Sequence, residues 1–294
     1  MYLAHFGLSE PPFGITPDTS FFFSCADYQQ ALNTLLIAVS DGEGFIKITG
    51  EVGTGKTLLC RQFLARINKD SADTQQRFVT AYIPNPYLEP RTLLLALAEE
   101  LGIVLRKDAD QHQLLKSLTL ALLDFAQQGK QVVLCLDEAQ AMPMETLEAV
   151  RLLSNLETEK HKLLQIVLFG QPELNTRLQQ DSIRQLNQRI TFHYHLSPLS
   201  RSDMSYYLAH RLTVAQGNIM AKVPSGRLFS QHAARVLHAA SGGIPRLVNI
   251  LAHKALMLTY GEGGQHVDAR HVRAAARDTE SAKHGLWRWL AMLQ

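Results

Sequence analysis

The feature that most constrains this chain is a short strand-like run that leads into a glycine-rich turn and then into a helical pattern. Apolar side chains alternate over 45–49, and a periodic apolar pattern of helical spacing begins at Leu58. Between them stands the segment Gly50-Glu51-Val52-Gly53-Thr54-Gly55-Lys56-Thr57. The order of strand, glycine turn, Lys-Thr pair and helix is the context that a phosphate-binding P-loop requires.

The residue types in this turn explain how it would hold phosphate. Glycines let the backbone turn its N–H groups inward around phosphate oxygens, and the new helix directs its positive end toward them. We expect Lys56 to reach the β- and γ-phosphates of a nucleotide and the Thr57 hydroxyl to coordinate Mg²⁺. The alternative is a glycine-rich turn with a chance lysine. The predicted nucleotide-binding residues are Gly50, Glu51, Val52, Gly53, Thr54, Gly55, Lys56, Thr57 and Leu58.

Two carboxylates follow a second apolar run. The run 131–136 is nearly unbroken and ends at Asp137 and Glu138. A strand that is apolar on both faces belongs in the middle of a parallel sheet, and open α/β sheets bind ligands at the carboxyl ends of their strands. We therefore expect Asp137 to hold Mg²⁺ and Glu138 to orient and deprotonate an attacking water. Two capping carboxylates in a strand-to-helix turn are the alternative.

A third apolar run, 163–169, ends just before Gln171. An amide at that edge is expected to bridge the γ-phosphate and the catalytic water, although it would also suit the cap of a helix that starts near Pro172. His193 and His195 fall on one face of a further predicted strand, 191–196. Their spacing permits metal binding, but no third ligand accompanies them, so hydrogen-bonded or solvated histidines are the better interpretation.

The remaining patterns predict two domains and a tail. Residues 1–197 are expected to form an α/β P-loop domain, with a parallel sheet flanked by helices and an irregular N-terminal segment. Residues 198–280 are expected to form a small all-α lid, and 281–294 an apolar tail that contains two tryptophans. The expected helices cover 27–40, 91–101, 111–128, 144–156, 173–188, 201–216, 230–241, 245–260 and 268–280, and 77–83 is a further expected strand.

Composition limits the class of protein and its compartment. The 294 residues are 46% hydrophobic and 19% charged with a net charge of +2, which describes a globular chain with no demand for nucleic acid. Three distant cysteines form no disulfide framework, which suits a reducing compartment. We find no leader pattern and no apolar run of about 20 residues. We expect a cytoplasmic protein, either free or peripheral at the inner membrane.

The ordered set of motifs resembles one family. A P-loop domain followed by a helical domain that carries Gly243-Ile244-Pro245-Arg246 is similar to the AAA+ ATPases. The closer resemblance is to the ExeA/GspA family, the ATPases of general secretion pathways and of type IV pili, including the MSHA type. The segments that carry it are 1–8, 12–18, 50–57, 136–140, 155–158, 170–174 and 243–246.

The resemblance implies roles for single residues. Asp137 and Glu138 match the Walker B pair, Gln171 matches sensor 1, and Arg246 matches the sensor-2 arginine of the lid. Arg189 matches the position of an arginine finger, which acts in a neighbouring subunit and so implies a homo-oligomer. Arg246 could instead be a surface charge at a helix start. Arg184 could instead be the arginine finger, and Arg189 could be an ordinary solvated residue at the end of a helix.

The resemblance also implies ATP and Mg²⁺ as ligands, and partners among pilus or secretion assembly proteins at the inner membrane. A nucleotide-switched DNA-binding or transposition-type ATPase is one alternative, but the sequence has no appended helix-turn-helix and no basic stripe. A scaffold that binds ATP and hardly hydrolyses it is another, which Asp137 and Glu138 argue against. Longer family members continue into a transmembrane helix and a peptidoglycan-binding domain, so a cell-wall-binding role is not expected here.

Overall fold

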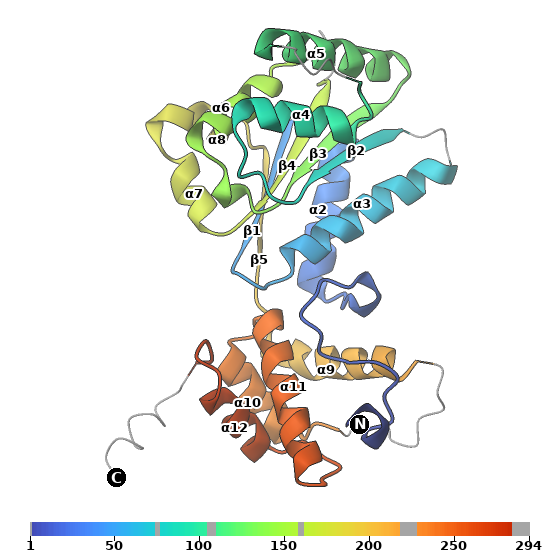
Figure 1. Ribbon diagram of the computed structural model, residues 1–294, viewed down its shortest axis with the longest axis vertical. Helices are drawn as coiled ribbons and strands as arrows, with labels where there is room; N and C mark the ends of the chain where they lie inside the picture. Colours follow the sequence, from blue (N-terminus) through green and yellow to red (C-terminus); the bar gives the residue numbers. More distant parts are fainter. Residues whose placement is uncertain (1, 74–76, 105–109, 158–161, 218–227, 284–294) are drawn as a thin grey trace. The chain divides into compact units, whose positions relative to one another are not determined.

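The computed structural model describes residues 2–73, 77–104, 110–157, 162–217 and 228–283 (Figure 1). Most of the expected tail therefore lies outside the described residues. By its contacts the chain divides into two units. The sheet unit holds Ala26–Gly50 and Lys56–Leu196, and the helical unit holds Met1–Cys25, Glu51–Gly55 and Ser197–Gln294. No helix in the described ranges has the length and the apolar character to cross a bilayer.

The sheet unit is built on five parallel strands, as predicted. Their order across the sheet is β2-β3-β4-β1-β5, so β3, the unbroken apolar run, is an interior strand between β2 and β4. The strands are β1 (Phe45–Gly50), β2 (Phe78–Ile83), β3 (Gln131–Leu136), β4 (Leu164–Gly170) and β5 (Phe192–Leu196). Because all strands are parallel, the residues that follow β1, β3 and β4 meet at one edge of the sheet.

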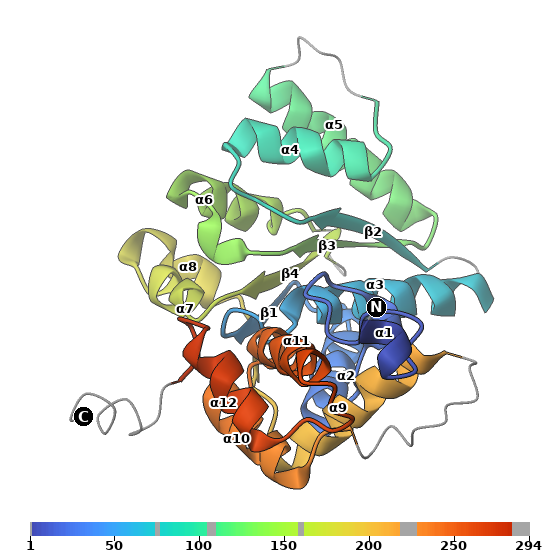
Figure 2. The same ribbon diagram turned by 60° about the horizontal axis from the view of Figure 1, so that its bottom comes forward.

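Helices cover both faces of this sheet, as Figure 2 shows. Helices α2 (Ala26–Ser40) and α3 (Lys56–Asp73) pack on one face. On the other face lie α4 (Pro90–Glu100), α5 (Gln111–Gln127) and α6 (Met144–Leu153). The buried leucines of α4, α5 and α6 form one core with Phe45 of β1 and alternate residues of β2, β3 and β4. That core fixes the strands whose carboxyl ends carry the candidate site.

The single helix predicted over 173–188 is wrong. The structure has α7 (Glu173–Leu178), a 3₁₀ turn (Asp181–Ile183) and α8 (Arg184–Asn187) in its place. The break occurs where Gln180 adopts an extended conformation, with ψ at 142°. The spacing of five residues from Leu178 to Ile183 does not fit one helical face, and the break lets both side chains enter the core, where each is at most 1% exposed.

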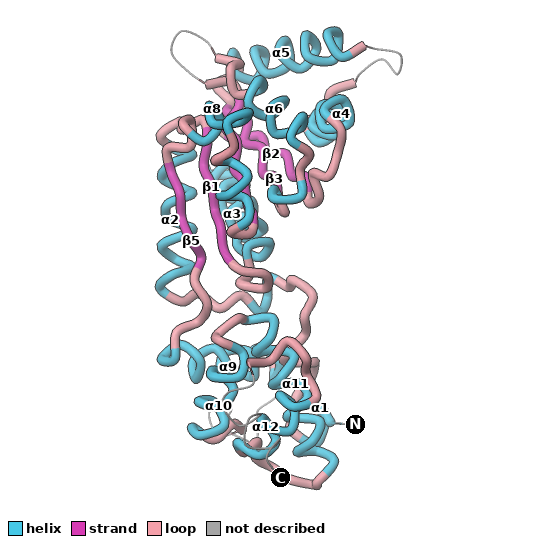
Figure 3. The backbone as a smooth tube through the Cα atoms, turned by 90° about the vertical axis from the view of Figure 1, so that its left-hand side faces the viewer, coloured by secondary structure: helices cyan, strands magenta, loops and turns pink. Residues whose placement is uncertain are grey.

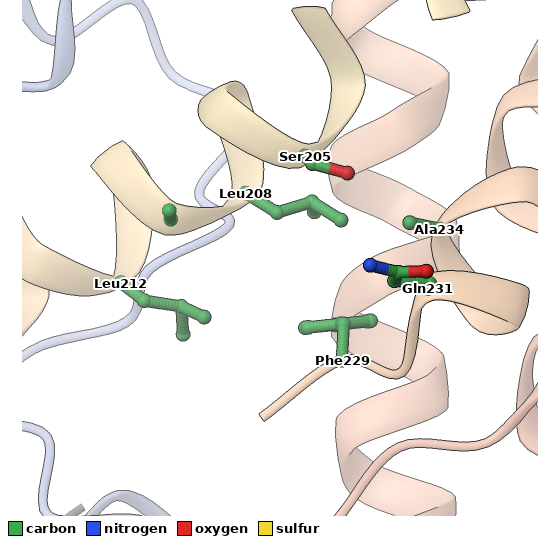
Figure 4. Close-up of a pocket in the computed structure, with 7 residues that line it drawn as sticks. Ser205, Leu208, Leu212, Phe229, Gln231 and Ala234 are labelled. Atoms are coloured by element: carbon green, nitrogen blue, oxygen red, sulfur yellow. The ribbon is translucent and has the colours of Figure 1, made fainter. Parts of the chain in front are cut away.

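The helical unit contains the four helices that the sequence predicts after Pro198. They are α9 (Arg201–Gln216), α10 (Gln231–Ser241), α11 (Pro245–Gly261) and α12 (Ala269–Arg277), preceded at the N-terminus by α1 (Tyr2–His5). Ser200 and Ser230 cap α9 and α10 by accepting hydrogen bonds from backbone N–H groups. Between α9 and α10 lies a small pocket of about 170 Å³, which none of the predicted site residues lines, and Leu208, Leu212 and Phe229 face it (Figure 4).

The N-terminal segment groups with the helical unit, whereas the expected boundary placed it with the sheet. Arg211, only 6% exposed, donates from Nε to the Pro12 carbonyl at 2.6 Å and from Nη2 to the Gly14 carbonyl at 3.2 Å. Its guanidinium also lies 4.3 Å from the centre of the Phe21 ring. Asn249 donates to the same Gly14 carbonyl at 3.0 Å. An irregular segment leaves its carbonyls without strand partners, and α9 and α11 supply the donors.

Candidate functional site

The glycine-rich turn has the backbone conformation that its composition predicts. Gly53 and Gly55 adopt φ values of 81° and 99°, a region that glycine enters without strain. The backbone N–H and the hydroxyl of Thr54 both donate to the Glu51 carbonyl, at 3.2 and 2.9 Å. A Cβ added to Gly53 would lie 2.6 Å from the Cβ of Arg246. Glycine at position 53 is therefore required by both its backbone angle and its neighbour.

Helix α3 begins at the end of this turn, and its first two residues carry the expected polar groups. Lys56 is 4% exposed, and its Nζ donates to the Gly50 carbonyl at 2.8 Å, so the ammonium group lies against the turn. Thr57 Oγ1 donates to Asp137 Oδ2 at 2.6 Å. The structure thus brings the P-loop threonine and the first Walker B carboxylate together, as the sequence predicts.

Asp137 is buried at the end of β3, with 2% of its surface exposed. Burial raises the pKa of its carboxyl, while the hydrogen bonds from Thr57 and from the Glu138 N–H act in the opposite direction. A hydroxyl and a buried carboxylate in direct contact are the oxygen ligands that Mg²⁺ prefers at a phosphate site. The donor chemistry of Thr57 and Asp137 therefore fits that ion.

Glu138 has an unusual backbone. Its φ is 52°, and among the described residues it is the one non-glycine with a positive φ. Such a conformation costs free energy in a residue with a Cβ, and strain of this kind gathers at functional sites. The sharp turn ends β3 and places the Glu138 side chain beside the residue that follows β4.

Two amides hold the Glu138 carboxylate. Gln140 Nε2 donates to Glu138 Oε2 at 2.6 Å, and Gln171 Nε2 donates to the same oxygen at 3.2 Å. The network closes because the Gln171 backbone N–H donates to Gln140 Oε1 at 2.9 Å. Arg177 on α7 fixes the turn by donating to the carbonyls of Gln140 and Met142. The structure thus brings the predicted Gln171 to Glu138.

Gln140 was not among the predicted site residues, although it belongs to the same motif. Its position two residues after Glu138, in a 3₁₀ turn (Ala139–Ala141), turns its amide back toward the carboxylate. An amide so close after a strand-end carboxylate pair was the available signal. Strand-end position alone, which pointed to Gln171, did not identify it.

The two predicted arginines lie at different places. Arg246 is the second residue of α11, and its backbone N–H donates to the Gly53 carbonyl at 3.1 Å within the helical unit, which also contains Glu51–Gly55. Arg189 follows α8 and donates from Nη1 to Ser154 Oγ at 2.8 Å, at the end of α6. Arg184 is exposed at the start of α8.

The paired histidines are hydrogen-bonded, as the sequence interpretation favoured. Thr49 Oγ1 lies 3.1 Å from His193 Nε2 and 3.3 Å from His195 Nδ1. In the part of the chain that the structure describes, no group of three His, Cys, Asp or Glu side chains is placed to hold a metal ion.

Comparison with known proteins extends these observations. An AAA domain model matches residues 39–178. The chain is 40% identical over 288 residues to the general secretion pathway protein A of Aeromonas hydrophila. That alignment covers 98% of this chain and 50% of the relative, so the chain spans about half the length of the curated protein it matches.

Solved structures share the fold. The Aeropyrum pernix ORC2 protein in its ADPNP and ADP complexes has a TM-score of 0.65 at 16% identity, covering 93% of this chain and 74% of that one. The Aeropyrum pernix ORC1 protein in complex with DNA has a TM-score of 0.67 at 15% identity, covering 92% and 70%. Identities this low establish a common P-loop sheet with its helical unit and nothing about the ligand.

Proposed function

Because this chain belongs to the AAA+ ATPases of the ExeA/GspA type, we propose that it hydrolyses Mg²⁺-bound ATP to drive the assembly of a secretion or pilus apparatus. The observation that carries the proposal is the Thr57–Asp137 contact of 2.6 Å, next to a Glu138 carboxylate that two amides hold. This arrangement would provide an ion-binding pair and a positioned base at the carboxyl edge of the sheet.

Nucleotide binding follows from the P-loop. The turn at Gly53 and Gly55 directs backbone N–H groups toward the phosphates, and Lys56 contributes its charge to the β- and γ-phosphates. Thr57 and Asp137 would hold Mg²⁺, which when bound neutralises charge on the phosphate oxygens. Because Lys56 Nζ now bonds the Gly50 carbonyl, ATP binding exchanges that bond for one to phosphate.

Hydrolysis needs a water aligned with the γ-phosphorus. Both amides bond Oε2 of Glu138, which leaves Oε1 to accept a hydrogen from that water. The water oxygen forms a bond to the γ-phosphorus, the proton passes to Glu138, and the bridging oxygen leaves with ADP. Gln171 fixes the rotamer of the base and contacts the γ-phosphate edge. Arg246 reports phosphate loss to the helical unit, and Arg189 stabilises the transition state of a neighbouring subunit.

The assembled machine is the finer part of the proposal. Within the family the motifs most resemble MshM, the ATPase of MSHA pilus biogenesis, and we propose a type IV pilus or type II secretion system as the recipient of the work. The partners would be assembly proteins at the inner membrane, with this chain bound peripherally as a homo-oligomer. The support is the ordered motif set and the similarity to general secretion pathway protein A over 98% of this chain.

The decisive experiment is steady-state ATP hydrolysis over a range of protein concentrations, with Glu138→Gln and Arg189→Ala beside the wild type. Specific activity should rise with concentration, and both variants should lose turnover while still binding ATP. Lys116→Met, which removes an exposed charge on α5, is the control and should hydrolyse like the wild type. A wild type that binds ATP but shows no turnover at any concentration would defeat the hydrolytic proposal and favour a nucleotide-switched scaffold.

A further inference from the structure

Four polar side chains share one face at the edge of the sheet. In the parallel register of β1 and β5, Lys47 pairs with His193 and Thr49 pairs with His195. Residues two apart on a strand point to the same side, so all four stand on one face. Strand β5 is one of the two edge strands and runs beside β1, as Figure 3 shows. We name these four residues the β1–β5 cluster.

Lys47 is the unusual member of the cluster. It is 6% exposed, although lysine is almost never buried without a partner. In the described ranges its ammonium group has no hydrogen bond and no ion pair, and its neighbour across β4 is the apolar Leu168. Burial lowers the pKa of Lys47. A buried cation with no counter-charge costs stability, and strained or costly features of this kind point to a function.

Thr49 orients the two imidazole rings. Its hydroxyl is fully buried and lies within hydrogen-bond distance of both His193 Nε2 and His195 Nδ1. A hydroxyl has one hydrogen, so it donates to one ring and accepts from the other. The remaining nitrogens, His193 Nδ1 and His195 Nε2, belong to exposed side chains. The ring that accepts from Thr49 must carry its proton on the outer nitrogen, and protonation of the second ring makes its outer nitrogen a donor as well.

We propose that the β1–β5 cluster binds an oxyanion, a phosphate or a carboxylate, through the Lys47 ammonium and the outward N–H groups of His193 and His195. The cluster offers one buried positive charge and two oriented donors, and within the described residues no acidic side chain forms an ion pair with it. The P-loop binds phosphate with backbone N–H groups beyond the strand ends, whereas this site uses side chains that stand on the face of the sheet. The inference does not depend on ATP hydrolysis.

Thermal unfolding of the full chain with inorganic phosphate tests the site. Because phosphate also suits the P-loop, every protein in the test carries Lys56→Ala, and ionic strength is held constant. We expect phosphate to raise the Tm by about 3 °C at ten times its dissociation constant. Adding Lys47→Met should abolish that rise and should increase the Tm measured without phosphate. Adding Lys116→Met instead, which removes an exposed lysine, should leave the rise intact.

A second measurement identifies the source of the anion. If the natural occupant is a carboxylate from a second copy of the chain, Lys47→Met should reduce the sedimentation coefficient of the assembly while Lys116→Met does not. If phosphate is the occupant, sedimentation stays the same and only the phosphate-dependent rise is lost. His195→Asn keeps Lys47 and tests whether the result for Lys47→Met comes from a folding defect. It should weaken the phosphate-dependent rise in Tm or the assembly, whichever depends on Lys47. Equal phosphate response and equal sedimentation in the Lys47→Met and Lys116→Met proteins would overturn the proposal.

Discussion

Two buried charges, one in each unit, have opposite surroundings. Arg211 in the helical unit is 6% exposed and bonds the carbonyls of Pro12 and Gly14, about 200 residues away in sequence. Asp137 in the sheet unit is 2% exposed and accepts hydrogen bonds from Thr57 and from the N–H of its neighbour Glu138. The Arg211 guanidinium is hydrogen-bonded to backbone carbonyls, which have a structural role. The Asp137 carboxylate is held by groups that a nucleotide site uses.

The groups that contact a buried charge determine whether its removal affects stability or activity. Removal of Arg211 would leave the Pro12 carbonyl without its donor and the Gly14 carbonyl with Asn249 alone, and we expect this loss to release the N-terminal segment. Because we propose that the Thr57 hydroxyl and the Asp137 carboxylate hold Mg²⁺, we expect removal of Asp137 to lower activity before it lowers stability. We therefore expect the two positions to separate stability from function.

The largest expected effect is on catalysis. Asp137→Asn should lower the ATP hydrolysis rate about 10³-fold, because the asparagine no longer supplies the charge that holds Mg²⁺ against the phosphates. The Tm should not fall, because burial already disfavours the charged form of this side chain. Coupled-enzyme turnover and differential scanning calorimetry on the same preparation measure both. A large drop in Tm would show that Asp137 is a structural charge like Arg211.

For Arg211→Met we expect a loss of stability. It should lower the free energy of unfolding by about 3 kcal/mol, because the Pro12 carbonyl loses its donor, the Gly14 carbonyl keeps only Asn249, and the contact with the Phe21 ring is lost. Limited proteolysis should then cut the segment before α2 faster than in the wild type. Arg235→Met, at an exposed arginine of α10, is the matched control and should change neither. Unchanged stability in the Arg211 variant would show that this buried charge does not stabilise the fold.

The sheet and the nucleotide turn could be predicted from the sequence because their signals are local. The apolar run 131–136 needs burial on both faces, and the angles at Gly53 and Gly55 are ones that glycine alone adopts freely. The contact of Thr57 with Asp137 follows, since the carboxyl ends of parallel strands meet at one edge of the sheet, here with β4 between β1 and β3. These inferences required no knowledge of distant packing.

The features that the sequence did not reveal depend on contacts between distant residues. Nothing near Pro12 indicates that Arg211 on α9 will bond its carbonyl, so the N-terminal segment was assigned to the sheet. The break after Leu178 depends on the position of the core, which the local helical pattern does not contain. The role of Gln140 depends on the left-handed turn at Glu138, a conformation that no residue type there predicts.

Lys47 differs from both Arg211 and Asp137 because, within the described residues, its buried ammonium group contacts neither backbone carbonyls nor the groups of the nucleotide site. Lys47→Met should increase the free energy of unfolding by about 1 kcal/mol, since a methionine of similar length fills the site without a desolvated charge. Urea unfolding with a constant m-value measures the change. Lys47→Arg, which keeps the charge, should give no increase. A loss of stability in Lys47→Met would mean that the ammonium group is already well satisfied, as the Arg211 guanidinium is.

The smallest expected effect is a pH dependence at His193. Partial desolvation of the ring, then the nearby Lys47 charge, then His195 lower the pKa of His193 below its ordinary value of about 6.5. Above about pH 6.5 the ring is neutral in both states, and it does not affect stability. As the pH falls below that value, the unfolded chain takes up a proton before the folded chain does, so the folded state loses stability. The loss stops once the pH is below the pKa of the folded state, because both states are then protonated. The Tm of His193→Asn between pH 5 and 8 should therefore lack this loss. Lys47→Met should reduce the loss without removing it, because burial is the larger cause.

A saturating anion should reverse the pH dependence of the Tm, since it favours the protonated ring. Arg211→Met is the control and should leave the pH dependence unchanged.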